Sequence, residues 1–153
     1  MKLGTGLAIL TSIIAVGTFA KKSYDNLWHN LKIAIPLQSV KVRPQIQTVS
    51  IDSSVLITNH YSKNFVLTKL HSTIFIKNKE GNLVEIGSTL PSVTELVLTK
   101  NKQSMIPSPT VVINSLTAVL GMKNVLTRPA GERLMIRSSM FINGIPFTTD
   151  VWY

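Results

Sequence analysis

The sequence predicts a mainly β protein: an antiparallel, immunoglobulin- or fibronectin-like β-sandwich of about seven strands with one short helix, preceded by a long N-terminal α-helix. Three observations support this prediction. Residues 3–20 carry no charge. From residue 33 onward, apolar and polar residues alternate with the two-residue period of strands. Turn-forming residues then divide the chain at short, regular intervals. We therefore expect a hydrophobic helix with a juxtamembrane extension over residues 1–31 and a sandwich over residues 32–153.

The uncharged segment is long enough to cross a bilayer. At a rise of about 1.5 Å per residue, its helix would measure about 27 Å, close to the thickness of the hydrocarbon core. Glycines such as Gly4, Gly6 and Gly17 are tolerated better in membrane helices than in soluble ones. The residues expected to form the anchor are Leu3, Leu7, Ile9, Leu10, Ile13, Ile14, Val16 and Phe19.

A helical stripe connects this segment to the chain that follows. Apolar residues recur at i, i+3, i+4 and i+7 from Tyr24 to Leu31, so one helix is expected from about Leu3 to about Leu31. Its last third resembles the cationic and aromatic belt of a membrane interface. The residues of this belt are Lys21, Lys22, Tyr24 and Trp28.

Two alternatives for the N-terminal segment stay open. It has the parts of a secretory signal peptide, with Lys2 before an apolar stretch at 7–16 and a small-residue site ending at Ala20. The lysine pair at 21–22 would then follow the cleavage site directly, which is unfavourable for export. The segment could also be a core helix of a soluble protein. A retained membrane anchor is the preferred interpretation.

The remaining chain reads as strands and one helix. Alternation predicts one strand over about 49–58 and another over about 67–78, followed by a turn at Gly81-Asn82. A short strand is expected at 83–88. Two more are expected within 93–103 and 105–115, joined by a polar turn at 100–103, and Pro107 and Pro109 suggest that the second begins at an edge or a bend. Residues 114–126 have helical spacing, with Asn114 or Ser115 as cap and Gly121 ending or kinking the helix.

The final strands carry the strongest local signal. Asn143-Gly144 separates two alternating runs by two residues, which predicts a type I′ hairpin. Pro146 cannot donate to a ladder, so its strand should be an edge. Trp152 and Tyr153 end this run. Either their alternation takes them into the core, or they form a contact with a partner subunit, for which aromatic residues are common anchors.

The order of these parts resembles a known family. The segment Asn59-His60-Tyr61-Ser62-Lys63-Asn64-Phe65 precedes a strand with the pattern LxxLxxTIFI, then Ile86-Gly87-Ser88, a short helix, and a strand–NG–strand containing GIPF. This arrangement over residues 40–153 is similar to the late-embryogenesis-abundant type 2 proteins (water-stress and hypersensitive-response domain), although His60 stands where that family has proline. The resemblance implies a non-enzymatic β-sandwich that often follows a transmembrane helix and contacts proteins or lipid.

The sequence contains no recognised catalytic, phosphate-binding or metal-binding motif. Cysteine is absent, which excludes disulfides and thiolate chemistry. The three histidines have no metal-ligand spacing, although His60 and His71 could meet across neighbouring strands. The seven carboxylates are isolated, although Asp52 could pair with Glu95 or Asp150 in space. We therefore expect no enzymatic activity, no cofactor, no metal and no small-molecule substrate.

These observations predict a membrane-anchored structural or interaction protein that acts as one subunit of a larger assembly, for example a membrane-containing virion or an envelope complex. Its expected partners are membrane lipid and other protein subunits. One alternative is an exported or soluble module that binds lipid or another apolar ligand between its sheets. Another is a basic protein associated with nucleic acid, because the net charge is +9. The basic residues are scattered and no nucleic-acid motif accompanies them, so this alternative is not preferred.

Overall fold

A computed structural model describes residues 29–114 and 116–153, with the side chains of Thr117 and Ala118 left out. Residues 32–153 form one compact unit, called the β unit below. The helix expected over residues 3–28 lies outside the described residues. Residues 29 and 30 are helical and a strand begins at Leu31, so the helical conformation ends within one residue of the expected position.

The described residues are mainly β, as predicted, and their strands pair in the antiparallel sense. The elements, in chain order, are β1 (Leu31–Ala34), the 3₁₀ turn η1 (Leu37–Ser39), β2 (Lys41–Pro44), β3 (Val49–Asp52), β4 (Ser54–Asn59), β5 (Phe65–Lys77), β6 (Leu83–Ser88), β7 (Leu96–Leu98), β8 (Lys102–Pro107), β9 (Val111–Ile113), α2 (Leu116–Leu126), β10 (Met135–Ile142) and β11 (Ile145–Trp152).

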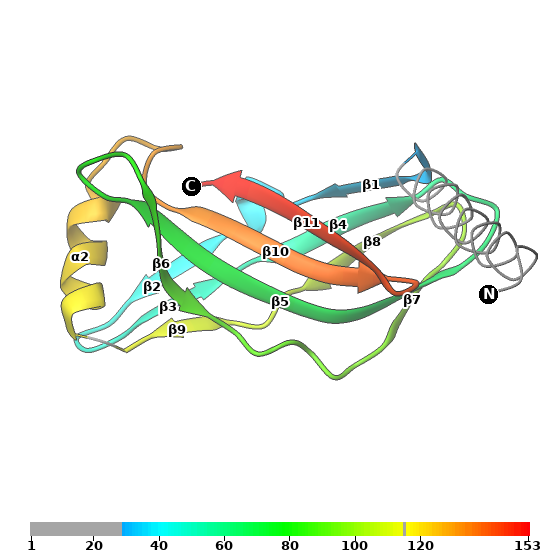
Figure 1. The fold of residues 1–153 in the computed structure, drawn as a ribbon, viewed down its shortest axis with the longest axis horizontal. Helices are drawn as coiled ribbons and strands as arrows, with labels where there is room; N and C mark the ends of the chain where they lie inside the picture. The colour runs from blue at the N-terminus through cyan, green and yellow to red at the C-terminus, as the bar shows by residue number, and fades with distance from the viewer. Residues whose placement is uncertain (1–28, 115) are drawn as a thin grey trace, which may run out of the picture. The chain divides into compact units, whose positions relative to one another are not determined.

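The strands form one five-stranded sheet and two three-stranded sheets. The larger sheet has the order β11-β10-β5-β6, with β7 also pairing with β5, and the smaller sheets are β1-β4-β8 and β2-β3-β9. Figure 1 shows β5, β10 and β11 crossing in front of the smaller sheets. The facing sheets enclose the apolar core, in which Leu67, Ile74 and Ile136 have no measurable exposure.

The two smaller sheets are the halves of one interrupted layer. Three segments of the chain run through both halves, and each is interrupted between its two strands. The interruptions are at Ser39 between β1 and β2, at Ser53 between β3 and β4, and at Ser108 between β8 and β9. Ser39 Oγ accepts a hydrogen bond from Ser54 N at 3.1 Å, and Ser108 N donates to the Ser53 carbonyl at 3.0 Å. The described residues therefore contain eleven strands rather than about seven.

A β-bulge lies within the long strand β5. Lys69 and Leu70 stand opposite the single residue Met140 of β10, where the register shifts. The extra residue changes which alternate positions face the core, so that Leu67 and Leu70 are both buried. Lys69 accommodates the bulge in the left-handed region, at φ 55°, which is uncommon for a residue with a side chain.

The predicted C-terminal hairpin is confirmed. Ile142 and Ile145 are cross-strand partners, and the two residues between them, Asn143 and Gly144, have φ values of 48° and 77°. Positive φ at both central positions is what a type I′ turn requires. Pro146 lies in β11, which is an edge strand of the larger sheet as expected.

The predicted helix is confirmed as α2, but it does not end at Gly121. The helix continues through Gly121 to Leu126. Val119, Met122 and Val125 repeat every three residues and are buried, so their packing holds the helix in place across the glycine. The proposed cap Ser115 lies outside the described residues.

Candidate functional site

Two chain connections cross between the layers at one end of the β unit. Residues 60–64 lead from β4 in the interrupted layer to β5 in the larger sheet, and residues 99–101 lead from β7 back to β8. β4 and β8 are paired, with Asn59 opposite Lys102, and β5 and β7 are paired, with Phe65 opposite Leu98. This pairing brings the two connections together.

The buried side chain of Asn59 forms hydrogen bonds to both connections. Its side chain is only 1% exposed, and its Nδ2 donates hydrogen bonds to the carbonyls of Lys63 at 2.9 Å and Leu98 at 3.1 Å. Its Oδ1 accepts a hydrogen bond from Tyr61 N at 2.9 Å. A buried amide needs such partners, since an unpaired polar group is costly to bury. The residue that carried the family resemblance therefore has a definite structural role.

Two further asparagines, Asn64 and Asn143, also form side-chain hydrogen bonds at this end. Asn64 Oδ1 accepts a hydrogen bond from Lys100 N at 2.9 Å, which links the two connections directly. Asn143 Oδ1 accepts from Val66 N at 2.8 Å, and Asn143 N donates to the Val66 carbonyl at 2.9 Å. The turn between β10 and β11 is thereby tied to the start of β5.

The fastened connections are basic. We define the basic end by the exposed residues His60, Lys63, Lys100 and Lys102. Residues 60–64 and 99–103 contain no Asp or Glu. Figure 1 shows β1 beginning at the end of the β unit where β4 ends and β8 begins, which is the basic end. The chain segment that precedes the β unit therefore joins it there.

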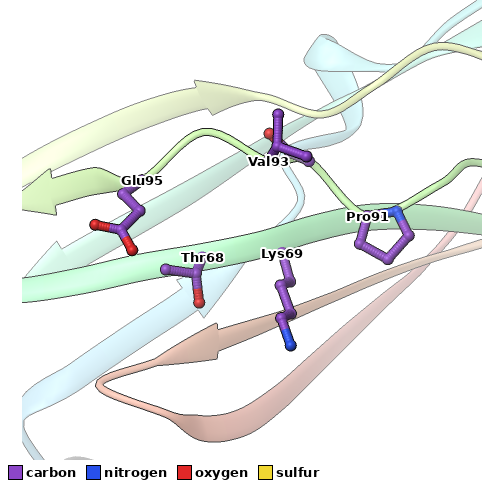
Figure 2. A pocket seen from close by; sticks show the side chains of 6 residues that line it. Thr68, Lys69, Pro91, Val93 and Glu95 are labelled. Carbon is purple, nitrogen blue, oxygen red and sulfur yellow. The ribbon is translucent and has the colours of Figure 1, made fainter.

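A surface groove of about 490 Å³ lies beside the bulge of β5. Its lining includes Thr68 and Lys69 from β5 and Pro91, Val93 and Glu95 from the connection between β6 and β7. Figure 2 shows this connection running alongside β5, with Glu95 near Thr68 and the Lys69 side chain extending away from Val93. The groove combines charged, hydroxyl and apolar groups.

The connection that borders the groove exposes large apolar side chains. Leu90 is 87% exposed and Val93 98% exposed, and Val97 on β7 is 62% exposed. Val97 stands opposite Val66, which is itself 37% exposed. Exposed apolar residues that adjoin one another are typical of contact surfaces.

The outer face of the larger sheet pairs cations with aromatic rings. Lys69 Nζ lies 5.3 Å from the centre of the Phe141 ring, and the Arg137 guanidinium lies 5.2 Å from that of Phe75. Arg137 also holds Asp150 through two hydrogen bonds of 2.8 Å. These hydrogen bonds raise the pKa of Arg137 above its ordinary value, so it stays protonated.

The C-terminal aromatic residues extend this pattern. Lys77 Nζ lies 4.9 Å from the centre of a Trp152 ring, and the Arg133 guanidinium 5.6 Å from that of Tyr153. Trp152 and Tyr153 are only half-buried, and with Leu37 they line a second groove of about 370 Å³. They are thus accessible at the surface, and the predicted partner contact stays a prediction.

The structure separates the polar residues considered for catalysis. Arg43 binds Asp52 at 2.6 Å, and Thr110 Oγ1 donates to the same carboxylate at 2.7 Å. Asp150 is held by Arg137 instead. Asp52 and Asp150 therefore each have their own arginine.

His60 and His71, which could have met across neighbouring strands, lie on parts of the chain that belong to different sheets. His60 follows β4 in the interrupted layer, and His71 lies on β5 opposite Ser139 of β10. Within residues 29–114 and 116–153, no three His, Asp or Glu side chains gather in a way that could hold a metal ion.

The expected anchor residues between Leu3 and Phe19 and the belt residues Lys21, Lys22, Tyr24 and Trp28 lie outside the described residues. Within the part of the chain that is described, no helix is long and apolar enough to cross a membrane.

No family model and no curated protein matches the chain. Among solved structures, a protein of Bordetella pertussis named ApaA is 18% identical, with 80% of this chain and 88% of that chain covered and a TM-score of 0.43. A protein from Archaeoglobus fulgidus is 12% identical over 80% and 93%, with a TM-score of 0.42. The sporulation control protein Spo0M of Bacillus subtilis is 10% identical over 81% and 47%, with a TM-score of 0.41. None of these descriptions names a late-embryogenesis-abundant domain.

Proposed function

We propose that this protein is a membrane-anchored, non-enzymatic interaction protein whose immunoglobulin- or fibronectin-like β unit acts as a subunit of a larger assembly. The observation that carries the proposal is where the β unit begins. Strand β1 starts at the basic end, and the chain before it contains the uncharged segment 3–20 followed by two lysines. A hydrophobic span followed by basic residues is the usual pattern of a membrane anchor and its interface.

The surface of the β unit supports a role in binding rather than catalysis. The described carboxylates Asp52 and Asp150 are engaged by arginines. The groove at Lys69 and the exposed apolar residues Leu90 and Val93 offer a surface for another protein subunit. A membrane-containing virion or a cell envelope complex is the proposed setting, in line with the resemblance to late-embryogenesis-abundant type 2 proteins.

Membrane fractionation of the full chain tests the proposal. The wild-type protein should remain with membranes through high-salt and alkaline washes and leave only with detergent. The variant Leu10→Lys/Ile13→Lys places two charges in the apolar run, which costs about 2.5–3.5 kcal/mol per residue at the centre of a span, and should appear in the soluble fraction. Leu83→Lys, which adds charge at an exposed position of β6, is the control and should stay membrane-bound. A wild-type chain that is soluble without detergent, with residues 1–30 intact, contradicts the proposal.

A further inference from the structure

We infer that the basic end binds the phosphate groups of anionic lipids in the membrane to which the chain is anchored. This inference rests on the proposed function and specifies which part of the β unit faces the bilayer. The occupant is a lipid surface that carries negative headgroups, and the binding groups are the ammonium groups of Lys63, Lys100 and Lys102.

The fold fixes these lysines on one end. The carbonyl of Lys63 is held by Asn59, and the backbone amide of Lys100 is held by Asn64. Lys102 is the cross-strand partner of Asn59. The backbone at all three positions is therefore held at the same end of the β unit.

The lysines are available to a ligand. Lys63, Lys100 and Lys102 are exposed, and the ion pairs found among the described residues involve Arg43 and Arg137 instead. No carboxylate lies in residues 60–64 or 99–103, and the nearest ones along the chain are Asp52 and Glu95. Among the described residues, these two connections thus carry positive charge and no carboxylate of their own, which attracts an anionic surface.

The position of β1 favours a lipid surface over other anionic partners. Because β1 begins at the basic end, the chain that connects to the proposed anchor leaves the β unit beside these lysines. Tyr61, half-buried and stacked on Phe65 with ring centres 5.6 Å apart, adds an aromatic group of the kind enriched at membrane interfaces. Each lysine near an anionic surface strengthens membrane binding about fivefold.

Lysine labelling in vesicles tests the orientation. The full-length protein is reconstituted into phosphatidylcholine vesicles, and into vesicles in which a quarter of the lipid is phosphatidylglycerol. An amine-reactive reagent is applied and each lysine is quantified by mass spectrometry. Lys63, Lys100 and Lys102 should react at least about fivefold more slowly in the anionic vesicles, and high salt should restore the rate. Lys79 and Lys123, exposed elsewhere on the β unit, should react equally in both. Equal rates for all five lysines overturn the inference.

A second experiment separates the inference from the proposed function. Full-length Leu10→Lys/Ile13→Lys, in which the anchor is broken, is cosedimented with anionic and with neutral vesicles. It should bind only the anionic ones. Adding Lys63→Glu/Lys100→Glu should weaken this binding at least about 25-fold, whereas the charge-matched control Lys79→Glu/Lys123→Glu should keep most of it. If the double glutamate variant loses its folded circular dichroism spectrum, Lys63→Gln/Lys100→Gln replaces it.

The outcomes are distinguishable. Loss of wild-type insertion into neutral vesicles refutes the proposed anchor, while the lysine-dependent binding of the anchor-broken variant still stands on its own. Binding that both charge variants weaken equally shows a general effect of net charge and overturns the inference. Displacement by inorganic phosphate, but not by chloride at the same ionic strength, assigns the site to free phosphate and overturns it. Displacement by an oligonucleotide under the same conditions assigns it to nucleic acid and does likewise.

Discussion

Asn59, the last residue of β4, donates a hydrogen bond from its Nδ2 to the carbonyl of Leu98, the last residue of β7, across 3.1 Å. The two residues are 39 positions apart in sequence and belong to different layers. The contact therefore joins the two layers through a single buried amide, at the basic end.

Replacing Asn59 should destabilise the protein strongly. Asn59→Ala removes three hydrogen bonds and leaves the buried carbonyl of Leu98 without its donor, which should cost about 2–4 kcal/mol of unfolding free energy. Asn64→Ala removes one exposed hydrogen bond and should cost about 1 kcal/mol or less. Chemical denaturation of the full chain in detergent measures both. Equal losses of unfolding free energy for the two variants would show that the buried amide of Asn59 does not stabilise this end more than the exposed amide of Asn64 does.

A close approach between the layers should make Gly87 sensitive to substitution. A Cβ at Gly87 would lie 3.1 Å from Cγ1 of both Val111 and Ile113 of β9, and Gly87→Ala should cost about 1–3 kcal/mol through overpacking. In the background of Val111→Ala the cost should fall, which a double-mutant cycle measures.

Gly121→Ala is the control for this prediction. A Cβ at Gly121 meets nothing within 4 Å, and the position lies inside a helix, so the variant should gain about 0.5–1 kcal/mol. A thermal shift of the same sign for the Gly87 and Gly121 variants would contradict the packing argument.

The left-handed conformation of Lys69 predicts a dependence on the branching of its side chain. Lys69→Val places a β-branched residue at φ 55° and should cost about 1–3 kcal/mol. Lys69→Gly removes the steric cost and gives up the contact with Phe141, two effects of about 1 kcal/mol that should nearly cancel. Unfolding free energies in detergent separate the two variants. If valine is tolerated as well as glycine, the bulge does not impose this conformation in solution.

The buried hydroxyl of Ser138 should be dispensable. Ser138 is 0% exposed, and its Oγ has no hydrogen-bond partner among the described residues. Burying an unpaired hydroxyl costs about 1–3 kcal/mol, so Ser138→Ala should leave the unfolding free energy unchanged or raise it. Ser139→Ala, on the half-buried outer face of the same strand, is the control and should have no effect. A loss of more than about 1 kcal/mol for Ser138→Ala would mean that the hydroxyl is hydrogen-bonded in solution.

Elements whose structure is determined by residues close in sequence could be predicted from local patterns. The Asn143-Gly144 turn and the strands beside it follow from turn chemistry and alternation. The helix over 116–126 follows from its spacing, although its continuation through Gly121 does not. Burial of Val119, Met122 and Val125 outweighs the local preference of glycine.

The division of the interrupted layer could not be predicted in the same way. Residues 49–58 alternate almost without fault, and the chain stays extended on both sides of Ser53. Only the change of pairing partner, from β9 before Ser53 to β8 after it, marks the break. The bulge at Lys69 did leave a sign in the sequence, because the apolar residues change from odd positions at Leu67 to even positions at Leu70.

The basic end could not be predicted from the sequence for a different reason. Lys63 and Lys100 are far apart in the sequence and look like members of a scattered surface charge. They lie at the same end because two connections cross between the layers there. Asn59 was noticed as part of a family pattern, but its partner Leu98 could be identified only from the fold.

The pairing of β5 with β10 also sets an order of events during synthesis. β5 is complete at Lys77, but the strand that lies along it begins only at Met135. At translation rates of about 5–20 residues per second, β5 waits about 3–12 s for this neighbour. The proposed anchor is synthesised even before β5, because it precedes β5 in the chain. The chain would therefore reach its membrane before its largest sheet can close, and the final hairpin would complete folding on a molecule that is already in place.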